Sequence, residues 1–248
     1  MAISPATSIP AQQATTPSAR LTGWLSAGML DWPGRVAGTL FISGCQMQCP
    51  YCHNPDLVQV HTDSAQRVWS EVVDYLQRRR AWVDGVVVTG GEPTSDPDLL
   101  PLLERLSSAG IPVKLDTNGL RPDVLKTVLK RKLASYVALD LKASKDGYRR
   151  LTDVADAGDR VAECAMMLMR SGIDHEFRTT CVPDVVGLDE IVEIARSVRG
   201  GSLYALQQFR PNVTLDPARK DVQPYAAAAL TGTAHACAQY LPTITRGV

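Results

Sequence analysis

The sequence has no long apolar run and no excess of one charge. None of its hydrophobic segments approaches the roughly 18 consecutive apolar residues of a membrane helix, which argues against a membrane-embedded protein. Lysine plus arginine and aspartate plus glutamate each number 26, so the formal net charge is zero. Proteins that bind nucleic acid or membrane surfaces usually carry a basic footprint, so this balance indicates neither kind of partner.

The N-terminal 20 residues also lack the charged and apolar regions of a secretory signal. They are rich in Ala, Pro, Ser, Thr and Gln, a composition that favours a disordered tail. The rest of the chain is long and hydrophobic enough to bury one core. We therefore expect a disordered tail over residues 1–20 and a single core domain over residues 21–248.

The six cysteines occur without any sign of export, and a chain of 248 residues does not need disulfides as covalent staples. We therefore predict a cytoplasmic protein with reduced thiols. In that setting, closely spaced cysteines bind metal or do chemistry more often than they pair.

From residue 36 onward, β-branched apolar runs alternate with amphipathic segments, which is typical of a parallel sheet with helices outside it. No GxGxxG motif follows the first strand, which disfavours a dinucleotide-binding sheet. Six such units favour an α/β fold of the TIM-like kind, an open, partial (β/α)6 barrel with outer helices. The predicted strands are 36–43, 85–91, 111–119, 136–142, 174–183 and 202–209, and the predicted helices 66–83, 96–110, 121–133, 159–172, 188–200 and 224–240.

Polar clusters follow these strands at their C-terminal ends. They read SGCQMQC, TGGEPT, DTNG, DLK, RTT and QQFRP in chain order. In barrels and open α/β sheets this edge is where ligands bind and chemistry happens. The pattern therefore predicts one active site built from all six clusters.

The first cluster contains Cys45, Cys49 and Cys52. A closed zinc site needs four ligands, and His53 or His61 could supply the fourth. Three thiolates would instead leave one iron of a [4Fe–4S] cluster without a protein ligand, as catalytic zinc keeps one open position. The spacing favours such an open, catalytic cluster.

The other three cysteines, Cys164, Cys181 and Cys237, are isolated from one another along the chain. Each stands where a small hydrophobic residue would fit, so we expect buried thiols that act as packing. Cys181 lies nearest the predicted functional edge.

The combination of C-x3-C-x2-C after the first strand and GGEP after the second resembles the radical S-adenosylmethionine superfamily. The resemblance implies that the three cysteines hold a [4Fe–4S] cluster whose open iron binds S-adenosylmethionine. It also implies that the reduced cluster cleaves this ligand to methionine and a 5′-deoxyadenosyl radical. Because that chemistry needs a strongly reducing cluster, flavodoxin or ferredoxin is an expected partner.

Further motifs resemble the glycyl-radical-enzyme activases, which work under anaerobic conditions. They are DWPG at 31–34, CPYCHNP at 49–55, LDTNG at 115–119, LDLK at 139–142 and QQFRP at 207–211. The pattern is nearest to the activases of anaerobic ribonucleoside-triphosphate reductase, with pyruvate formate-lyase activases as relatives. It implies an oxidoreductase that generates a glycyl radical on a partner enzyme. The alternatives are a pyruvate formate-lyase-type activase, a radical S-adenosylmethionine enzyme acting on a small molecule or peptide, and a metal-stabilised binding module.

The resemblance implies roles for residues beside the cysteines. Tyr51 packs near the adenine, and His53 lies near the adenosine. Gly90 and Gly91 let the backbone approach the methionine group, and Glu92 bonds its amino group or orients the loop.

The later motifs imply further ligand contacts. Asp140 and Lys142 contact S-adenosylmethionine, and Arg178 steadies the glycine loop of the partner. Pyruvate formate-lyase activases carry a histidine near the ribose where this chain has Gln207 and Gln208. A glutamine there fits the reductase-activating branch, and we expect Gln208 at the cofactor.

The resemblance also implies a cation site. Asp31, Asp116 and Thr117 match positions that hold a monovalent cation beside the cofactor in pyruvate formate-lyase activase. Oxygen ligands of this kind suit hard cations, although they also serve helix caps and turns.

Overall fold

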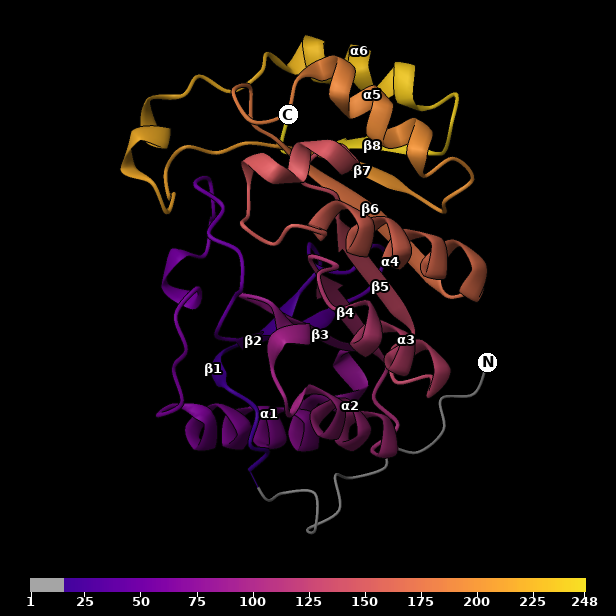
Figure 1. Cartoon of the computed structure of the whole chain (residues 1–248). Helices are drawn as coiled ribbons and strands as arrows, with labels where there is room; N and C mark the ends of the chain where they lie inside the picture. The colour runs from indigo at the N-terminus through magenta and orange to yellow at the C-terminus, as the bar shows by residue number, and fades with distance from the viewer. Residues whose placement is uncertain (1–15) are drawn as a thin grey trace. The chain divides into compact units, whose positions relative to one another are not determined.

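The computed structural model describes residues 16–248, and within them the chain divides into two compact units. We describe each unit by itself (Figure 1). The first unit comprises the chain up to residue 46 with 57–116 and 128–136, and the second comprises 47–56, 117–127 and 137–248.

The predicted N-terminal tail lies outside the described residues over 1–15. Packed chain begins a little before residue 21. Ala19 is fully buried, and the Arg20 backbone N–H donates to the Asp96 carboxylate at 2.8 Å.

The first unit holds strands β1 (Leu21–Gly28), β2 (Ala37–Ile42), β3 (Gly85–Gly90) and β4 (Val113–Thr117). β1 pairs antiparallel with β2, whereas β2, β3 and β4 run parallel in chain order. The parallel strands are buried along most of their length, and the apolar runs of β2 and β3 are typical of strands covered on both faces. Their C-terminal ends therefore share one edge, the edge at which the first three polar clusters begin.

Two helices belong to this unit, α1 (Ala65–Arg79) and α2 (Leu99–Ser108). α1 packs against β1, where the Trp24 and Tyr75 rings meet edge-to-face at 5.9 Å. α2 closes on Gly110, which has a φ of 68° in the predicted C′ position. The predicted first helix is too long because the chain turns into a 3-10 segment, η3 (Arg80–Trp82).

The second unit holds strands β5 (Tyr136–Asp140), β6 (Asp174–Cys181), β7 (Tyr204–Gln208) and β8 (Thr243–Arg246), adjacent in chain order. β6, β7 and β8 are parallel. Its helices are most of α3 (Pro122–Lys130), whose residues from 128 on belong to the first unit, and α4 (Ala157–Ser171), α5 (Leu188–Ser197) and α6 (Ala227–Cys237). α5 lies beside α6, which packs on β7 and β8 (Figure 1).

All six predicted strands are present, so the predicted α/β class with an open, mostly parallel sheet and surrounding helices is confirmed. β1 and β8 were not predicted. β1 is half-exposed and interrupted by Gly23, and β8 has only four residues, so neither produces a strong apolar run.

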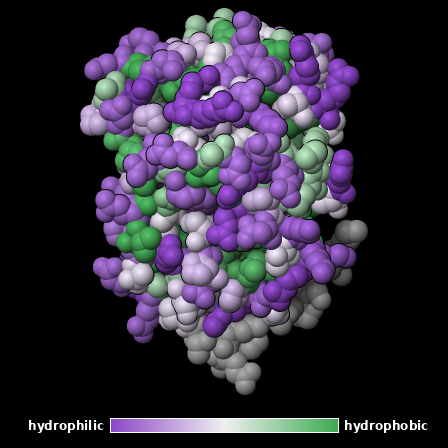
Figure 2. Space-filling model, in the orientation of Figure 1, coloured by the Kyte–Doolittle hydropathy of each residue, from purple (hydrophilic) through white to green (hydrophobic). Residues whose placement is uncertain are grey.

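Among residues 16–248, no helix combines the length and the apolar character that crossing a bilayer would require. Figure 2 shows apolar residues dispersed among hydrophilic ones on the face drawn.

Candidate active site

The second and third cysteines flank a tight turn in the second unit. The Cys52 N–H donates to the Cys49 carbonyl at 3.0 Å, and Pro50 occupies the second position, where its fixed φ fits a β-turn. The Asp216 N–H donates to the Pro50 carbonyl at 2.9 Å, which ties the turn to the start of η6 (Pro217–Asp221). Two free thiols are thus held on one short, anchored loop.

The first cysteine, Cys45, follows the end of β2 in the first unit. Gly44 has a φ of 94°, and its N–H donates to the Leu57 carbonyl at 2.8 Å. The Cys45 N–H then donates to the Val58 carbonyl at 3.0 Å. These bonds fix where the cysteine loop starts, and Cys45 is partly exposed and forms no disulfide.

The positive charge of Lys142 acts on the pKa of two residues of the cysteine loop, Cys49 and Tyr51. Burial raises the pKa of the Cys49 thiol, and the nearby ammonium of Lys142 opposes that rise. Tyr51 is buried, and burial raises the pKa of its phenol as well. Its hydroxyl has no hydrogen-bond partner among the described residues, although buried polar groups are almost always bonded.

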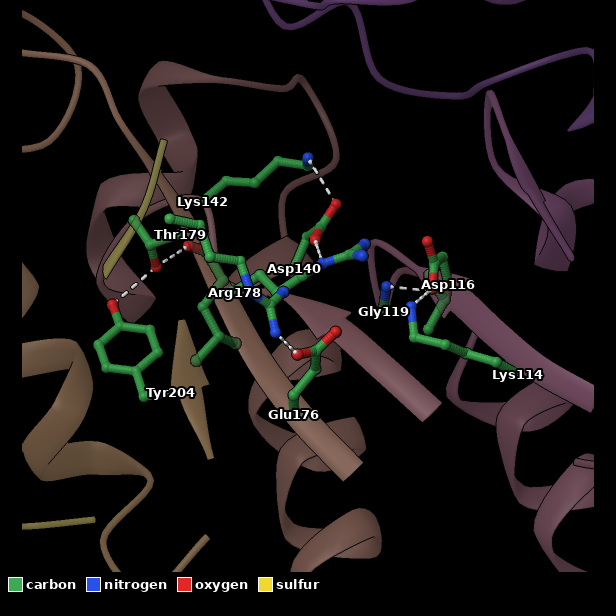
Figure 3. A network of polar contacts seen from close by, with 12 residues as sticks. Lys114, Asp116, Gly119, Asp140, Lys142, Glu176, Arg178, Thr179 and Tyr204 are labelled. Atoms are coloured by element: carbon green, nitrogen blue, oxygen red, sulfur yellow. Dashed lines mark hydrogen bonds and ion pairs between the residues drawn. The ribbon is translucent and has the colours of Figure 1, made fainter. Parts of the chain in front are cut away.

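Asp140 at the end of β5 accepts from two cations (Figure 3). Arg178 Nε donates to its Oδ1 at 2.8 Å, and Lys142 Nζ lies 3.4 Å from its Oδ2. Burial acts to raise the pKa of Asp140, but the two positive charges outweigh it and hold the pKa below its usual value. In turn, burial acts to lower the pKa of Lys142, and Asp140 leads the anions that keep it well above its usual value. The pair is therefore ionised.

The backbone around this pair is held at several atoms. Arg178 O accepts the Leu141 N–H at 2.7 Å, and the Thr179 hydroxyl donates to Leu141 O at 2.6 Å. The Tyr148 hydroxyl accepts from the Lys142 N–H at 3.1 Å. These bonds fix the position of both charged side chains. Tyr148 lies in η5 (Lys145–Arg150) and was not singled out from the sequence, since it belongs to no motif.

The two glycines after β3 are in close contact with the loop after β2. Gly90 has a φ of 133°, and a Cβ there would lie 2.1 Å from Ile42 O. A Cβ on Gly91 would lie 2.6 Å from Gly44 O. Glu92 is buried, and its Oε1 accepts from the Thr94 N–H and hydroxyl, which caps η4 (Pro93–Ser95). Within the described chain, these glycines allow two loops to meet.

The residues expected at a cation site have separate partners. Asp116 pairs with Lys114, whose Nζ lies 2.5 Å from Oδ1. The Thr117 hydroxyl accepts from the Gly119 N–H at 3.1 Å. Asp31 is exposed, and its Oδ2 accepts from the Thr39 hydroxyl at 2.8 Å.

A cavity of about 250 Å³ opens at the C-terminal ends of β6, β7 and β8. His53 contributes to it, and its ring stacks on Phe209 at 6.0 Å. Burial lowers the pKa of His53. Gln208 Nε2 donates to Tyr225 O at 2.7 Å, whereas its buried Oε1 has no partner in the described chain. The cavity is lined by His53, Thr180, Gln207, Gln208, Arg210, Arg246 and Gly247.

Arg210 belongs to the predicted QQFRP cluster, although it was given no role of its own, whereas the lining residues Arg246 and Gly247 were missed from the sequence. Register explains part of this lining, because Thr180, Gln207 and Arg246 are neighbours across the three strands. Arg246 also pairs with the buried carboxylate of Glu176 at 2.5 Å. Only the short strand β8 brings Arg246 here, and that strand was not predicted.

The remaining cysteines are buried, as expected. Cys164 donates to Gly119 O at 3.2 Å. Burial raises the pKa of Cys181 to about 12 and that of Cys237 to about 11. Thiols of this kind are protonated and act as small packing groups.

Comparison with known proteins identifies the family. The family model of the radical SAM superfamily matches residues 39–198, which include the cysteine loop, the glycine loop and Asp140. Members of this superfamily use a [4Fe–4S] cluster and S-adenosylmethionine, so the prediction of these two cofactors is confirmed.

The residues fit these groups chemically. Cys45, Cys49 and Cys52 supply three free thiols on one loop, the donor type that iron–sulfur clusters require. Between residues 16 and 248, the side chains as they stand form no group of three His, Cys, Asp or Glu residues that could hold a metal ion. The unbonded hydroxyl of Tyr51 and the unbonded Gln208 oxygen suit a polar organic ligand.

Relatives of similar length narrow the family. The chain is 32% identical over 205 residues to a putative glycyl-radical enzyme activating enzyme of Methanocaldococcus jannaschii, covering 80% of this chain and 83% of the relative. It is 30% identical to the pyruvate formate-lyase-activating enzyme of Streptococcus mutans, covering 74% and 73%.

Solved structures show the same fold. Streptococcus suis SuiB bound to S-adenosylmethionine matches with a TM-score of 0.62 at 18% identity, covering 82% of this chain and 48% of that one. A domain of a pyruvate-formate lyase-activating enzyme from Bacteroides vulgatus matches with a TM-score of 0.53 at 17% identity, covering 66% and 99%. The chain belongs to the radical SAM superfamily and, within it, to the enzymes that activate glycyl-radical enzymes.

Proposed function

We propose that this enzyme generates a glycyl radical on anaerobic ribonucleoside-triphosphate reductase. When bound, the reduced cluster supplies the electron that cleaves S-adenosylmethionine, and the resulting 5′-deoxyadenosyl radical takes a hydrogen atom from a glycine of the partner. The observation that carries the proposal is the anchored loop with three free thiols beside the unbonded hydroxyl of Tyr51.

In this proposal Cys45, Cys49 and Cys52 hold the cluster and leave one iron open. The turn between Cys49 and Cys52 sets the spacing of two ligands. The positive charge of Lys142 opposes the rise that burial causes in the pKa of Cys49, and so favours the thiolate form of that residue. A thiolate is the ligand form, so a nearby cation favours binding.

Asp140 and Lys142 are proposed to bind the charged and hydroxyl groups of S-adenosylmethionine. Arg178 donates a 2.8 Å hydrogen bond to Asp140, and this contact keeps the carboxylate ionised and in one orientation. This contact supports a positioning role for Arg178, in addition to the role at the partner's glycine loop that the resemblance implies.

Tyr51, His53 and Gln208 are proposed to contact the adenosine. His53 and Gln208 line the 250 Å³ cavity, and Gln208 brings an acceptor that has no partner in the described chain. Gly90 and Gly91 are proposed to expose backbone to the methionine group, with Glu92 holding the loop through its bonds to Thr94.

We also propose flavodoxin or ferredoxin as the reductant and the cytoplasm as the location, where six free thiols stay reduced. The reductase is preferred over pyruvate formate-lyase because glutamine, and not histidine, ends β7. The family assignment leaves the alternative of a metal-stabilised binding module without support.

The partner is tested by mixing the reconstituted enzyme, S-adenosylmethionine and reduced flavodoxin with either reductase or pyruvate formate-lyase, without oxygen. Electron paramagnetic resonance should show a glycyl doublet with the reductase and a much weaker one with the lyase. A doublet only with pyruvate formate-lyase would reassign the partner. Deoxyadenosine release without a doublet on either protein would point to a small-molecule or peptide substrate.

A further inference from the structure

Lys114 on β4 is a lysine with no exposed surface. Its neighbour across the parallel pairing to β3 is Val87, a core residue. Burying an ammonium in such surroundings is strongly unfavourable unless a partner compensates its charge. The charge of Lys114 therefore needs compensating groups close to it inside the first unit.

The compensating groups are next to it. Asp116 lies two residues farther along β4 and so on the same face, and Lys114 Nζ lies 2.5 Å from its Oδ1 (Figure 3). The ammonium also lies 5.8 Å from the centroid of the Tyr136 ring, within range of a cation–π contact.

We propose that the ammonium of Lys114 replaces the monovalent cation expected at Asp116, so that this enzyme needs neither K⁺ nor Na⁺ to bind and cleave S-adenosylmethionine. The inference rests on the proposed function and on the place beside the cofactor that the family resemblance implies for Asp116. A second cation at the same carboxylate would be repelled by an ammonium already bonded to it. The other expected cation ligands, Thr117 and Asp31, also have their own partners.

The charge argument gives a specific expectation for Lys114→Met. Methionine fills a similar volume without charge, so the carboxylate of Asp116 loses its closest cation and must recruit one from solution. The variant should therefore gain the cation dependence that the natural enzyme lacks. Lys145→Met is the matched control, because Lys145 is an exposed lysine paired with Asp159.

The experiment uses the reconstituted enzyme and two readouts. Deoxyadenosine release is measured with K⁺, Na⁺ or tetramethylammonium, which is too large for a carboxylate site in the core, as the sole monovalent cation. Binding of Tl⁺, a K⁺ probe, is measured by thallium NMR. The natural enzyme and Lys145→Met should differ by less than about twofold between cations and bind no Tl⁺ at this site.

Lys114→Met should lose at least about tenfold of its activity in tetramethylammonium, recover in K⁺ and bind one Tl⁺ per chain. The proposal is overturned if the natural enzyme depends on K⁺, or if it binds Tl⁺ and Asp116→Asn abolishes that binding. It is equally overturned if Lys114→Met folds and stays independent of the cation. Should that variant not fold, the measurements on the natural enzyme and Asp116→Asn still decide the question. Because Tl⁺ binding needs no partner protein, failure here is distinguishable from failure of the proposed glycyl-radical function.

Discussion

Two cations converge on Asp140, and they fix its charge and orientation. Arg178 makes the shorter contact, at 2.8 Å, and Lys142 the longer one, at 3.4 Å. Side chains that hold one another in this way present a defined charge pattern to a ligand before it arrives. That pre-organisation lowers the entropic cost of binding.

Arg178→Gln should weaken binding of S-adenosylmethionine. Loss of a charge-assisted hydrogen bond to a partly buried carboxylate costs about 1.5–3 kcal/mol, which corresponds to about 10- to 150-fold in Kd. Calorimetric titration of the cluster-loaded enzyme with S-adenosylmethionine measures the change. The control is Arg121→Gln, which breaks an exposed pair with Asp123 and should leave Kd unchanged. Equal Kd values for both variants would refute the positioning role.

The ion pair also predicts a dependence of stability on pH. The pKa of Asp140 is lower in the folded chain than in the unfolded one, so its stabilising contribution is complete above about pH 4, the unfolded value. It is lost as the pH falls through the folded value. Urea unfolding of the chain and of Asp140→Asn between pH 6 and 3 should show free energies of unfolding that converge below about pH 4. Asp123→Asn, which alters an exposed pair, should show little difference at any pH.

Motif residues were predictable one by one, but their partners were not. LDLK identified Asp140 and Lys142 because polar residues interrupt an apolar run at the end of a strand. Tyr148 follows six residues later in a polar segment, and nothing local indicates that its hydroxyl returns to the Lys142 backbone. Lys114 did carry a signal, a lysine inside an apolar run two residues before Asp116. Its burial depends on tertiary packing that a local pattern does not contain.

Among the elements, the segment after β3 depends most on glycine. Gly90 combines a φ of 133° with a backbone oxygen 2.1 Å from where its Cβ would be. The backbone atoms that a Cβ on Gly90 would meet belong to Ile42 of β2, the strand that leads into the cysteine loop. Any side chain here would separate the two loops that carry the first two motifs.

Gly90→Ala should therefore lower the free energy of unfolding by about 3 kcal/mol or more, because it combines backbone strain of about 1–3 kcal/mol with a clash. It should also reduce the iron bound after reconstitution. Thermal unfolding and iron analysis measure the two effects. Gly232→Ala in α6 is the matched control, since apart from its chain neighbours and the backbone of its own helix no atom lies within 4 Å of its Cβ position. Alanine in a helix interior should stabilise by about 0.5–1 kcal/mol, so opposite signs are expected for the two substitutions.

Elements with a strong apolar period were predicted well, and short or half-exposed ones were not. The central strands carry runs such as VVV and VAL that only burial explains. β8 contributes Arg246 to the cavity although its four residues, TITR, produce no such signal. The missed part of the site thus follows from a missed strand.

At the scale of the whole molecule, the cysteine triplet should decide whether the enzyme carries iron. Cys49→Ser should lose most of the roughly four irons of a [4Fe–4S] cluster after anaerobic reconstitution, because two thiolates hold a cluster poorly. Cys164→Ser is the control, as that thiol is buried away from the loop and bonds Gly119 O. Iron analysis and the brown absorbance of the cluster measure both. Full iron content in the Cys49 variant would refute the ligand assignment.

The bond between Asp216 and Pro50 has a consequence for biosynthesis. Residues 47–56 pack in a unit whose remaining parts lie at 117–127 and 137–248. The ribosome therefore makes the cysteine turn long before the segment that anchors it. At about 5–20 residues per second, some 10–30 s pass between synthesis of Cys52 and synthesis of Asp216. During that interval the cysteine turn lacks its bond to Asp216, so brief oxygen exposure should harm newly made enzyme more than finished enzyme.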